Sequence, residues 1–514
     1  MESSRKEGGS LAVLGAVCLA ALILPLSFSG GAVATPAIGR DLGGSPTSLT
    51  WITNAFMLSF GSLLMAAGAL ADEYGRKRVF AIGVGLFVIF SLALSFAPTV
   101  GMIDILRAAQ GVGAAAALSG GTASLAQEFH GKAQARAFSM LGTTFGIGLA
   151  FGPIISGYLI EAFGWRSIFL TTTVVGSLAL VFGVPRMRET RDPNATGPDW
   201  AGVLTFTGML TTFTYGVIEA PESGWASPIV IGMLTASAVL LAAFIYAETH
   251  VRRPMLDISL FRYHRFIGVQ ALPIATCFCY VVMLILLPLR FIGVEGMSEV
   301  EAGLLMIALS APMLFVPTIA VTLTRWVSPG IVSTIGLLIA ALGLVWLGSL
   351  DARAGTSAVL PMLVIGLGAG LPWGLMDGLS VSVVPKERAG MATGIFSTTR
   401  VAGEGVSLAI VSAILAALSA GSIHHIVEAS GLAPLANQRE IAQRVATGDL
   451  AGAAAIAPPA IQPMLAQSYA DAFQQLTWLL AGLTIAAAIA VYYFLGRIRV
   501  EEQSAAGEPA ESMA

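Results

Sequence analysis

Long apolar segments recur along almost the whole chain, and they restrict its fold more than any single motif does. A helix needs about 20 mostly apolar residues to cross a bilayer, and polar breaks divide this chain into about fourteen such runs. Only 11% of the residues are charged, against about 25% in ordinary soluble domains. Backbone groups in lipid must be hydrogen-bonded within the protein, and no run alternates like a barrel strand. We therefore predict an all-α polytopic membrane protein.

The polar breaks set the bounds of the expected spans. We place them at residues 11–34, 49–70, 79–97, 102–127, 135–160, 167–185, 200–218, 228–248, 265–290, 299–324, 330–350, 357–384, 389–419 and 471–495. The first run is longer than the apolar core of a signal peptide, which has about 7–15 residues, so we expect an uncleaved first helix. Residues 420–470 include an alanine- and proline-rich stretch, and we expect a long outer loop there.

The positions of lysine and arginine predict the orientation of the spans, because cytoplasmic loops are enriched in these residues. With the N-terminus inside, nineteen of the 27 lysines and arginines fall on the cytoplasmic side. Six fall on the outer side, and Arg290 is one of them. We therefore expect a multi-pass protein of the cell inner (plasma) membrane, with the N-terminal residues 1–10 and the tail 496–514 in the cytoplasm.

Several classes of partner and chemistry find no support in the sequence. The net charge is −3, without a basic arm or recognition helix, so we expect no nucleic-acid partner. Cys18, Cys277 and Cys279 lie in apolar runs, without the spacing of a disulfide framework or a zinc site. His424 and His425 could form a metal or pH site, or they could simply be solvated residues of a loop. No G-x-x-x-x-G-K-[ST] segment for ATP occurs. We expect no enzyme, cofactor or metal, and a proton gradient as the energy source.

A short charged turn, GALADEYGRKRVF, separates the second and third runs. Its basic cluster would hold the loop on the cytoplasmic side, and this topological role alone is one explanation. The turn also resembles the loop between the second and third helices of major facilitator superfamily transporters, G-x-L-a-D-x-x-G-R-[KR]. The resemblance rests on Gly68, Leu70, Ala71, Asp72, Gly75, Arg76 and Lys77. It implies that the turn takes part in conformational gating.

The fourth run carries two opposite charges, Asp104 and Arg107. A guanidinium within the membrane is costly and usually faces a cavity or a partner. In one explanation Asp104, one turn away, simply neutralises Arg107. The stretch LRAAQGVGAAAA also resembles the superfamily's fourth-helix motif, R-x-x-q-G-x-g. That resemblance implies that Arg107 takes part in proton transfer, and we assign Asp104 with it to proton coupling.

The fifth run, LGTTFGIGLAFGPIISGYL, is rich in glycine. Glycines four residues apart allow a neighbouring helix to approach closely, and a proline inside a helix permits a bend. Tight packing alone is one explanation. Gly148, Gly152, Pro153 and Gly157 also match G-x-x-x-G-P-x-x-G, a fifth-helix motif that is associated with antiporters of the superfamily. This resemblance implies export. We assign these four residues, together with Arg400 of the thirteenth run, to conformational gating.

With the later segments GLGAGLPWGL and ERAGMATGIFSTTRVAGEGVSLAI, the resemblance covers nearly the whole chain. The chain is similar to the fourteen-helix drug:proton antiporter branch of the superfamily. This similarity implies two pseudo-symmetric six-helix bundles, at 11–185 and 265–495, which alternate access to a site between them. The intervening segment 186–264 would hold two additional helices and a basic cytoplasmic loop.

The chain departs from the branch in its first helix. Where the branch carries an aspartate in l-D-x-T-i-v-n-v-A-l-P, the sequence LSFSGGAVATPAI has Ser27, although Ala34 and Pro36 still match. One expected proton carrier or cation contact is therefore missing. The second-half copy of the charged turn, TLTRWVSPG, keeps only Arg325.

Other acids in the membrane must then carry the coupling. Asp377 lies in the twelfth run and Glu404 in the thirteenth, four residues after Arg400. Counted from the turn between these runs, Asp377 and Arg400 come to similar depths, so we predict that they pair and leave Glu404 free. A buried acid without a close cation can load and release a proton near neutral pH. Alternatively, Arg400 and Glu404 form a structural i,i+4 pair, or Asp377 contacts a cationic substrate.

The remaining candidates for a substrate cavity are aromatic residues and a methionine, which suit loose recognition of lipophilic compounds. They are Trp51, Phe56, Phe145, Tyr280, Met283 and Trp373, with Asp377 as the charged member. Each could instead be a packing or lipid-facing residue. We predict a monomeric, proton-coupled exporter of lipophilic or cationic toxic compounds. The alternative is a carrier of a defined metabolite, such as a siderophore, an amino acid or an organic acid.

Overall fold

The computed structural model of the chain describes residues 2–129, 131–191, 199–251, 254, 256, 258–351, 354–384, 389–430, 435 and 437–496. The expected cytoplasmic tail lies outside these residues from position 497 onward. Every regular element in the described ranges is a helix or a helical turn. The all-α expectation is therefore confirmed.

The first half of the chain and the hairpin that follows it form eight long helices. Their bounds are α1 Glu2–Leu42, α2 Pro46–Tyr74, α3 Arg76–Leu94, α4 Val100–Glu128, α5 Gly131–Phe163, α6 Arg166–Leu178, α7 Trp200–Ser223 and α8 Pro228–His250. Helix α6 continues through the turns η1 Ala179–Gly183 and η2 Val184–Arg186. The α7–α8 hairpin lies within a few residues of the two additional spans expected at 200–218 and 228–248.

The second half contains helices that are interrupted by short turns. Its helices are α9 His264–Thr276, α10 Val282–Leu289, α11 Glu299–Ser310, α12 Pro312–Leu323, α13 Pro329–Gly348, α14 Val359–Ser382, α15 Ala389–Ala429, α16 Gln438–Ala446, α17 Leu450–Ile456 and α18 Leu465–Leu495. Its turns are η3 Ile258–Arg262, η4 Cys277–Val281, η5 Arg290–Val294, η6 Gly355–Ala358 and η8 Gln462–Met464. The run η4–α10–η5 continues α9, so that 264–294 act as one span.

Within the described ranges, twelve helices are long and apolar enough to cross a membrane, or thirteen if the bent α5 counts as one span. Helix α4 is not among them, although it has 29 residues, because Asp104, Arg107, Gln110 and many small residues make it less apolar. The count of fourteen spans therefore stays a prediction.

Serine and proline residues position several helix starts. Ser45, Ser227 and Ser328 each accept a hydrogen bond from a backbone N–H in the first turn that follows them, and proline is the next residue in each case. This arrangement satisfies one free N–H of the helix and supplies a preset φ where no N–H is needed. Ser298 and Glu301 form a complete capping box at the start of α11.

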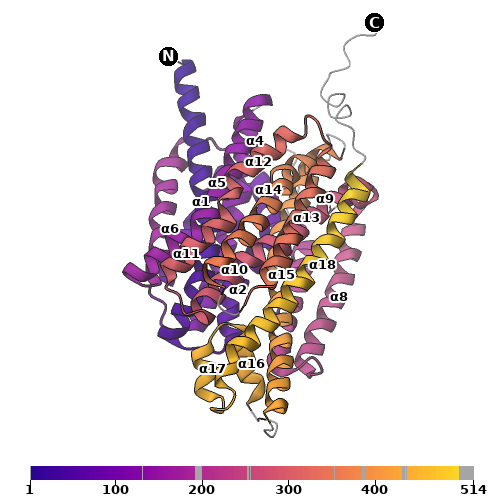
Figure 1. Ribbon diagram of the computed structural model, residues 1–514. Helices are drawn as coiled ribbons and strands as arrows, with labels where there is room; N and C mark the ends of the chain where they lie inside the picture. Colours follow the sequence, from indigo (N-terminus) through magenta and orange to yellow (C-terminus); the bar gives the residue numbers. More distant parts are fainter. Residues whose placement is uncertain are drawn as a thin grey trace.

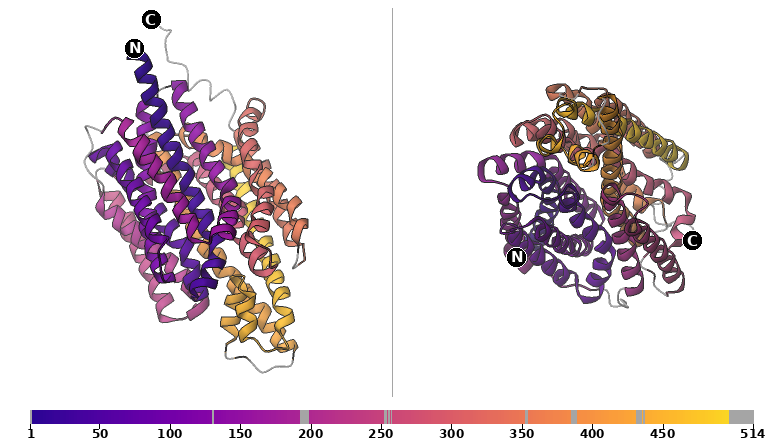
Figure 2. Two further views of the ribbon diagram at one scale, coloured as in Figure 1. Left: turned by 90° about the vertical axis from the view of Figure 1, so that its left-hand side faces the viewer. Right: turned by 90° about the horizontal axis from the view of Figure 1, so that it is seen from below.

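Two groups of helices lie side by side with the α7–α8 hairpin at the periphery (Figures 1 and 2). In the first group α4 packs on α2 and α3, and α1 packs on α5; in the second, α13 packs on α14 and α18. Helix α7 contacts α2 and α15, whereas only 17% of the apolar window of α8 is buried. Helix α1 begins and α18 ends on the same side of the bundle, which we call the terminal face. The opposite face carries α16 and α17.

The segment expected as a long outer loop, 420–470, is largely helical in the structure. Helix α15 continues to Ala429, because no proline interrupts the sequence until Pro434. Helix α16 is amphipathic and buries Ile441 and Val445, and α17 follows after a turn at Gly448. We call α16 and α17 the cap. The earlier expectation failed because the polar residues of this segment cover one face of short helices.

The two halves meet through closely packed backbones at two places. A Cβ at Gly61 of α2 would overlap the backbone of Ala402 in α15. A Cβ at Gly157 of α5 would overlap the carbonyl of Glu299 at the start of α11, and Gly303 of α11 faces the backbone of Ile154. Small residues permit such approach between membrane helices. These contacts make α2–α15 and α5–α11 the main links between the halves.

Two glycines of α3 provide a matched test of close packing. A Cβ at Gly83 would overlap the backbone of Ala117 in α4, whereas a Cβ at Gly85 meets no atom within 4 Å. We expect Gly83→Ala to lower the free energy of unfolding by about 1–3 kcal/mol through overpacking. Gly85→Ala should leave it unchanged or raise it by up to about 1 kcal/mol, because alanine favours helix. Unfolding in detergent measures both; equal effects would contradict the packing.

Candidate functional site

A cavity of about 510 Å³ lies between the two halves at the cap end of the bundle. Its walls come from α1 and α2 of the first half, α10, η5 and α15 of the second half, and the end of α7. Residues 443–451 of the cap form its roof. The volume falls in the range of about 300–1,000 Å³ that is usual for ligand pockets.

One wall of the cavity is polar and the other is apolar. Helical spacing places Thr35 of α1 and Thr50, Thr53 and Asn54 of α2 on the polar wall. The facing wall consists of aliphatic side chains from α10, η5 and α15. These are Ile285, Leu286, Leu289, Ile292, Leu408 and Leu415. The cavity is thus amphipathic across its width.

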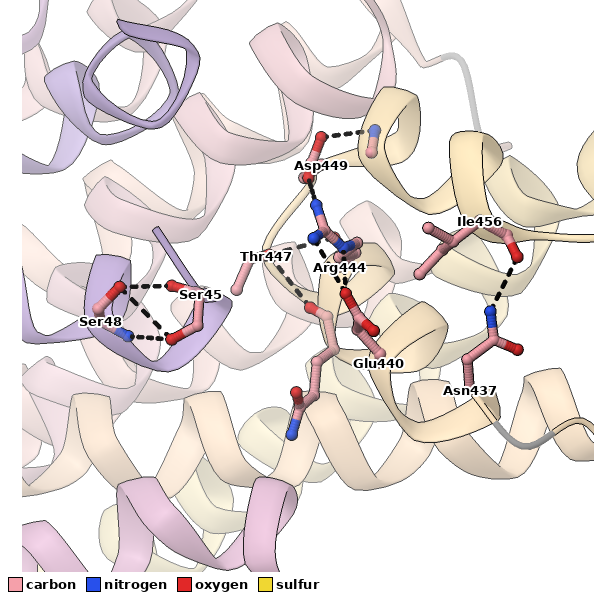
Figure 3. A network of polar contacts seen from close by, with 10 residues as sticks. Ser45, Ser48, Asn437, Glu440, Arg444, Thr447, Asp449 and Ile456 are labelled. Carbon is pink, nitrogen blue, oxygen red and sulfur yellow. Dashed lines mark hydrogen bonds and ion pairs between the residues drawn. The ribbon is translucent and has the colours of Figure 1, made fainter. Parts of the chain in front are cut away.

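An ion-pair network holds the roof together (Figure 3). Arg444 donates to Glu440 (3.0 Å) on one side and to Asp449 (3.0 Å) on the other. Burial lowers the pKa of Arg444, but the hydrogen bonds to these two carboxylates outweigh it and raise that pKa above its ordinary value. The guanidinium therefore stays charged throughout the physiological pH range. Asn437 donates to the carbonyl of Ile456 (2.8 Å) and closes the cap at its ends.

Arg107 is fully buried behind the polar wall. Its Nε donates to the carbonyl of Ile52 (2.9 Å), and its Nη1 donates to Ser27 Oγ (2.9 Å) and Gln110 Oε1 (2.7 Å). Its guanidinium lies over the ring of Phe56, 4.4 Å from the ring centroid. A Cβ at Gly31 would lie 2.9 Å from Nη2, so α1 approaches closely here. The network joins α1, α2 and α4.

No carboxylate forms an ion pair with Arg107 within the described part of the chain, although Asp104 on the same helix interacts with it electrostatically. Asp104 forms no ion pair with it, and Asp104 Oδ1 is buried without a hydrogen-bond partner. The two side chains thus form no direct ion pair, and the explanation that Asp104 neutralises Arg107 stays a prediction. Ser27, which stands at the aspartate position of the branch that the sequence resembles, bonds directly to the guanidinium. The missing acid thus leaves a buried cation with neutral partners.

A second charged cluster lies on α14 and α15, toward the terminal face. Asp377 and Arg400 pair as expected, with Arg400 Nη1 3.2 Å from Asp377 Oδ1. The Asp377 side chain is 59% exposed, and the Arg400 guanidinium lies 5.9 Å from the centroid of the Phe145 ring. Glu404, one turn along α15, is half-buried, and its carboxylate has no hydrogen-bond or ion-pair partner among the described residues. The alternative Arg400–Glu404 pair does not form.

The charged turn between α2 and α3 contacts the segment that follows α6. Asp72 accepts a hydrogen bond from Arg76 (2.8 Å), and Lys77 Nζ donates to the carbonyl of Met187 (2.8 Å). Gly75 has φ +113°, a conformation that side chains rarely adopt, and its Cα faces the Glu189 carboxylate. Gly68 faces open space. These contacts all lie within the first half. The gating role of Gly68, Asp72, Gly75, Arg76 and Lys77 therefore stays a prediction.

The glycine motif of α5 divides its contacts between two neighbours. Gly148 faces Pro25 and the Leu22 carbonyl of α1, and Gly152 faces Ser29 of α1. Gly157 faces α11 of the other half. Helix α5 bends by 42° just before Pro153, as expected from the proline. The motif thus lies where α1, α5 and α11 meet, and its role in gating, like that of Arg400, stays a prediction.

The predicted substrate-cavity residues do not line the cavity under the cap. Phe56, Tyr280 and Met283 are fully buried, and Tyr280 packs edge-on against Trp373 (6.1 Å between ring centroids). Trp51 packs against Tyr215 of α7. Phe145 and Asp377 lie around Arg400 instead. The structure therefore divides this predicted set among the core, the hairpin contact and the Arg400 cluster.

Sequence reasoning missed two features. The cavity's threonines and Asn54 could have been found from their helical spacing, since they repeat every three or four residues on α2. Arg290, expected in an outer loop, is only 1% exposed; it pairs with Glu295 (2.9 Å) and lies over Phe473. Its side chain also donates to the carbonyl of Asp351 (2.7 Å). Nothing in the sequence near Arg290 indicates these distant partners.

Comparisons with known proteins agree with this architecture. Residues 17–408 match the family model of the Major Facilitator Superfamily. The multidrug resistance protein Stp of Mycobacterium tuberculosis is 32% identical over 387 residues, which cover 75% of this chain and 72% of that protein. The tetracenomycin C resistance and export protein of Streptomyces glaucescens is 28% identical over 78% of this chain and 75% of its own length.

Two further comparisons concern a relative and a solved structure. A probable actinorhodin transporter of Streptomyces coelicolor is 32% identical, over 74% of this chain and 68% of that protein. The crystal structure of a D-xylose–proton symporter superposes with a TM-score of 0.62 at 14% identity. It covers 96% of this chain and 99% of the symporter chain. At that identity the symporter shows a shared fold alone.

The contact between Ser27 and Arg107 predicts how an acid at position 27 would behave. We expect Ser27→Asp to leave the free energy of unfolding nearly unchanged, because the new carboxylate meets the guanidinium. In an Arg107→Leu background, the same substitution should cost about 3–5 kcal/mol, because it leaves a buried charge unpaired. Ser27→Asn in both backgrounds is the uncharged control. Additive effects in this double-mutant cycle would contradict the contact.

The ion-pair network of the cap predicts its local stability. Arg444→Gln removes both ion pairs, and we expect amide hydrogen exchange in 438–456 to become roughly fivefold faster, which corresponds to about 1 kcal/mol. Arg439→Gln, on the exposed side of α16, is the matched control and should leave exchange unchanged. Exchange that is equally fast in both variants would show that the network does not hold the cap.

Proposed function

The chain belongs to the Major Facilitator Superfamily, and we propose that it is a proton-coupled exporter of lipophilic toxic compounds. Its curated relatives include proteins named for multidrug resistance and for the export of tetracenomycin C, and this supports a transporter of small molecules out of the cell. The proton coupling is our own inference from the charged groups of the membrane-spanning helices.

The observation that carries the proposal is the position of Glu404. Its carboxylate has no hydrogen-bond or ion-pair partner among the described residues, whereas Asp377 of α14 is paired with Arg400. Leu408, one turn along α15 from Glu404, lines the cavity, and Gly405 packs against Met57 of α2. Glu404 therefore lies between the cavity and the Asp377–Arg400 pair, at a contact between the halves. A free carboxylate there can exchange a proton with either side as the halves move.

We propose an exchange cycle in which protonation and substrate binding alternate. A proton that enters from outside would neutralise Glu404 and let the α2–α15 contact close over it. Its release on the cytoplasmic side would restore the charge and accompany the loading of substrate. Asp377 would act as a second acid whenever Arg400 moves away from it. Arg107, which has no carboxylate partner, would keep α1, α2 and α4 together during this motion.

The proposal includes the orientation of the chain. The excess of lysine and arginine at the terminal face supports a cytoplasmic position for both termini in the inner (plasma) membrane. The cap would then lie outside the cell. We further propose that the protein works as a monomer, because the cavity and both charged clusters are complete within one chain.

A carrier of a defined metabolite is the second candidate. The observation that favours it is the polar wall of Thr35, Thr50, Thr53 and Asn54, which offers more hydrogen-bonding groups than loose recognition of lipophilic compounds needs. Ser27 also favours a metabolite carrier, because it replaces the first-helix aspartate that could contact a cationic drug.

Inverted membrane vesicles with an imposed pH gradient test the exporter. We expect lipophilic compounds to dissipate the gradient, which a ΔpH-sensitive dye reports as dequenching. Glu404→Gln should abolish this response, because a glutamine carries no exchangeable proton. Glu428→Gln changes an exposed acid on the same helix (67% exposed) and should behave like the unchanged protein.

Asp377→Asn separates the two acids in the same assay. We expect it to weaken the response severalfold but to keep it, because Glu404 still carries a proton. Undiminished responses in both Glu404→Gln and Asp377→Asn would refute coupling through this cluster. No response to any compound, with folded protein in the vesicles, would favour the metabolite carrier.

A further inference from the structure

We propose that the cavity under the cap is a binding site for neutral, amphipathic molecules that carry hydroxyl or amide hydrogen-bond donors. This inference rests on the proposed function only in taking the ligand to be a transported small molecule. The site combines the cavity itself, an unpartnered buried oxygen on its polar wall, and a roof without a free carboxylate.

Asn54 points to the donor on the ligand. It is 0% exposed and lines the cavity. Its Nδ2 donates to the carbonyl of Thr50 (3.1 Å), and because that carbonyl only accepts, the orientation of the amide is fixed. Its Oδ1 is then left buried without a hydrogen-bond partner. A buried polar atom costs free energy until it is hydrogen-bonded, so a ligand that donates to Oδ1 gains affinity.

The charges around the cavity favour a neutral ligand. The ionisable residues in its lining are Arg40, Arg444 and Asp449. Arg40 forms an ion pair with Glu299 of α11, and Arg444 holds Asp449 and Glu440. A lipophilic cation would meet two guanidinium groups and no carboxylate that is free to pair with it. An anion would have to displace a carboxylate from one of these arginines.

The two walls select an amphipathic shape. A molecule with its donors on one edge can place them against Asn54 and the threonines of α2, and its apolar edge against Leu286, Leu289 and Leu408. Because one wall comes from each half of the protein, such a ligand would bridge the two halves. Gly448, between the two cap helices, packs directly against Gly293 of η5, so the cap is held against the second half beside this site.

A pair of steroids provides the test. Cortisol carries three hydroxyl donors, whereas progesterone has the same ring system and no donor. We expect tritiated cortisol to bind the purified protein in nanodiscs, and Asn54→Leu to weaken this binding roughly fivefold to tenfold, the worth of one hydrogen bond. Progesterone binding should be unchanged in Asn54→Leu, which also shows that the variant is folded. Equal effects on both steroids would overturn the role of Asn54.

Blocking the cavity tests its position. Ser412 of α15 lines the cavity, whereas Ala417 on the same helix is exposed. We expect Ser412→Trp to abolish the binding of both steroids and Ala417→Trp to leave it intact. If Ser412→Trp binds cortisol normally, or if the unchanged protein binds no cortisol, the proposed site is refuted.

The preference for a neutral ligand can be tested with a substitution that should create cation binding. Tetraphenylphosphonium and tetraphenylborate have the same shape and opposite charges, and we expect neither to compete with cortisol in the unchanged protein. Asn54→Asp should create competition by tetraphenylphosphonium, because it adds a carboxylate to the polar wall. Strong competition by either ion in the unchanged protein would contradict a neutral ligand.

The steroid assay tests the binding site and the vesicle assay tests proton coupling, so one proposal can be refuted without the other. Glu404→Gln should bind cortisol normally while it loses the dissipation of the pH gradient. Normal steroid binding without any proton coupling would refute the proposed exporter and keep the site. Intact coupling without cortisol binding would refute the site alone.

Discussion

Helices in a bilayer cannot be held together by the hydrophobic effect alone, since lipid tails are as apolar as the side chains they would replace. The helices are instead held together by close packing of their backbones, which the 58 glycines of the chain permit. The contacts Gly61–Ala402 and Gly157–Glu299 join the two halves, and Gly148 and Gly152 seat α5 on α1. Everything that lies between the halves, including the cavity and Glu404, is positioned by these contacts.

The few charged side chains within the helices differ in whether they have a partner of opposite charge. Arg290 and Glu295 neutralise each other, and Asp377 holds Arg400. Arg107 has only neutral hydrogen-bond partners, and Glu404 has none among the described residues. Among the described residues, Arg107 in the first half and Glu404 in the second thus lack a direct ion pair. Such groups are costly in a membrane and mark functional positions more often than structural ones.

The sequence allowed the helical architecture to be predicted because each span must satisfy its own backbone, which leaves a long apolar run as its mark. It also predicted the Asp377–Arg400 pair, since helix geometry and one nearby turn fix the relative depth of these residues. The buried pair of Arg290 and Glu295 could not be foreseen, because its surroundings come from distant helices. The cap was missed because its helices are short and half polar.

The cavity could be predicted from the sequence only in part. Its polar residues repeat with helical spacing along α2, so the sequence indicated a polar face, but only the fold shows that this face meets an apolar wall from the other half. The aromatic residues expected to line a cavity pack in the core, against the hairpin or around Arg400 instead. Residue type alone therefore indicated a lipophilic environment without locating the site.

Helix α15 extends without interruption over 41 residues, from Ala389 to Ala429, which is about 60 Å of rigid rod. Glu404 lies nearer to Ala389 than to Ala429, Leu408 and Ser412 form part of the cavity wall, and His424 toward the far end contacts Gln438 of α16. A rigid rod that pivots near its middle moves its two ends in opposite directions. A small tilt of α15 at Glu404 would therefore displace the cap through the rigid helix alone, without any rearrangement of the cavity.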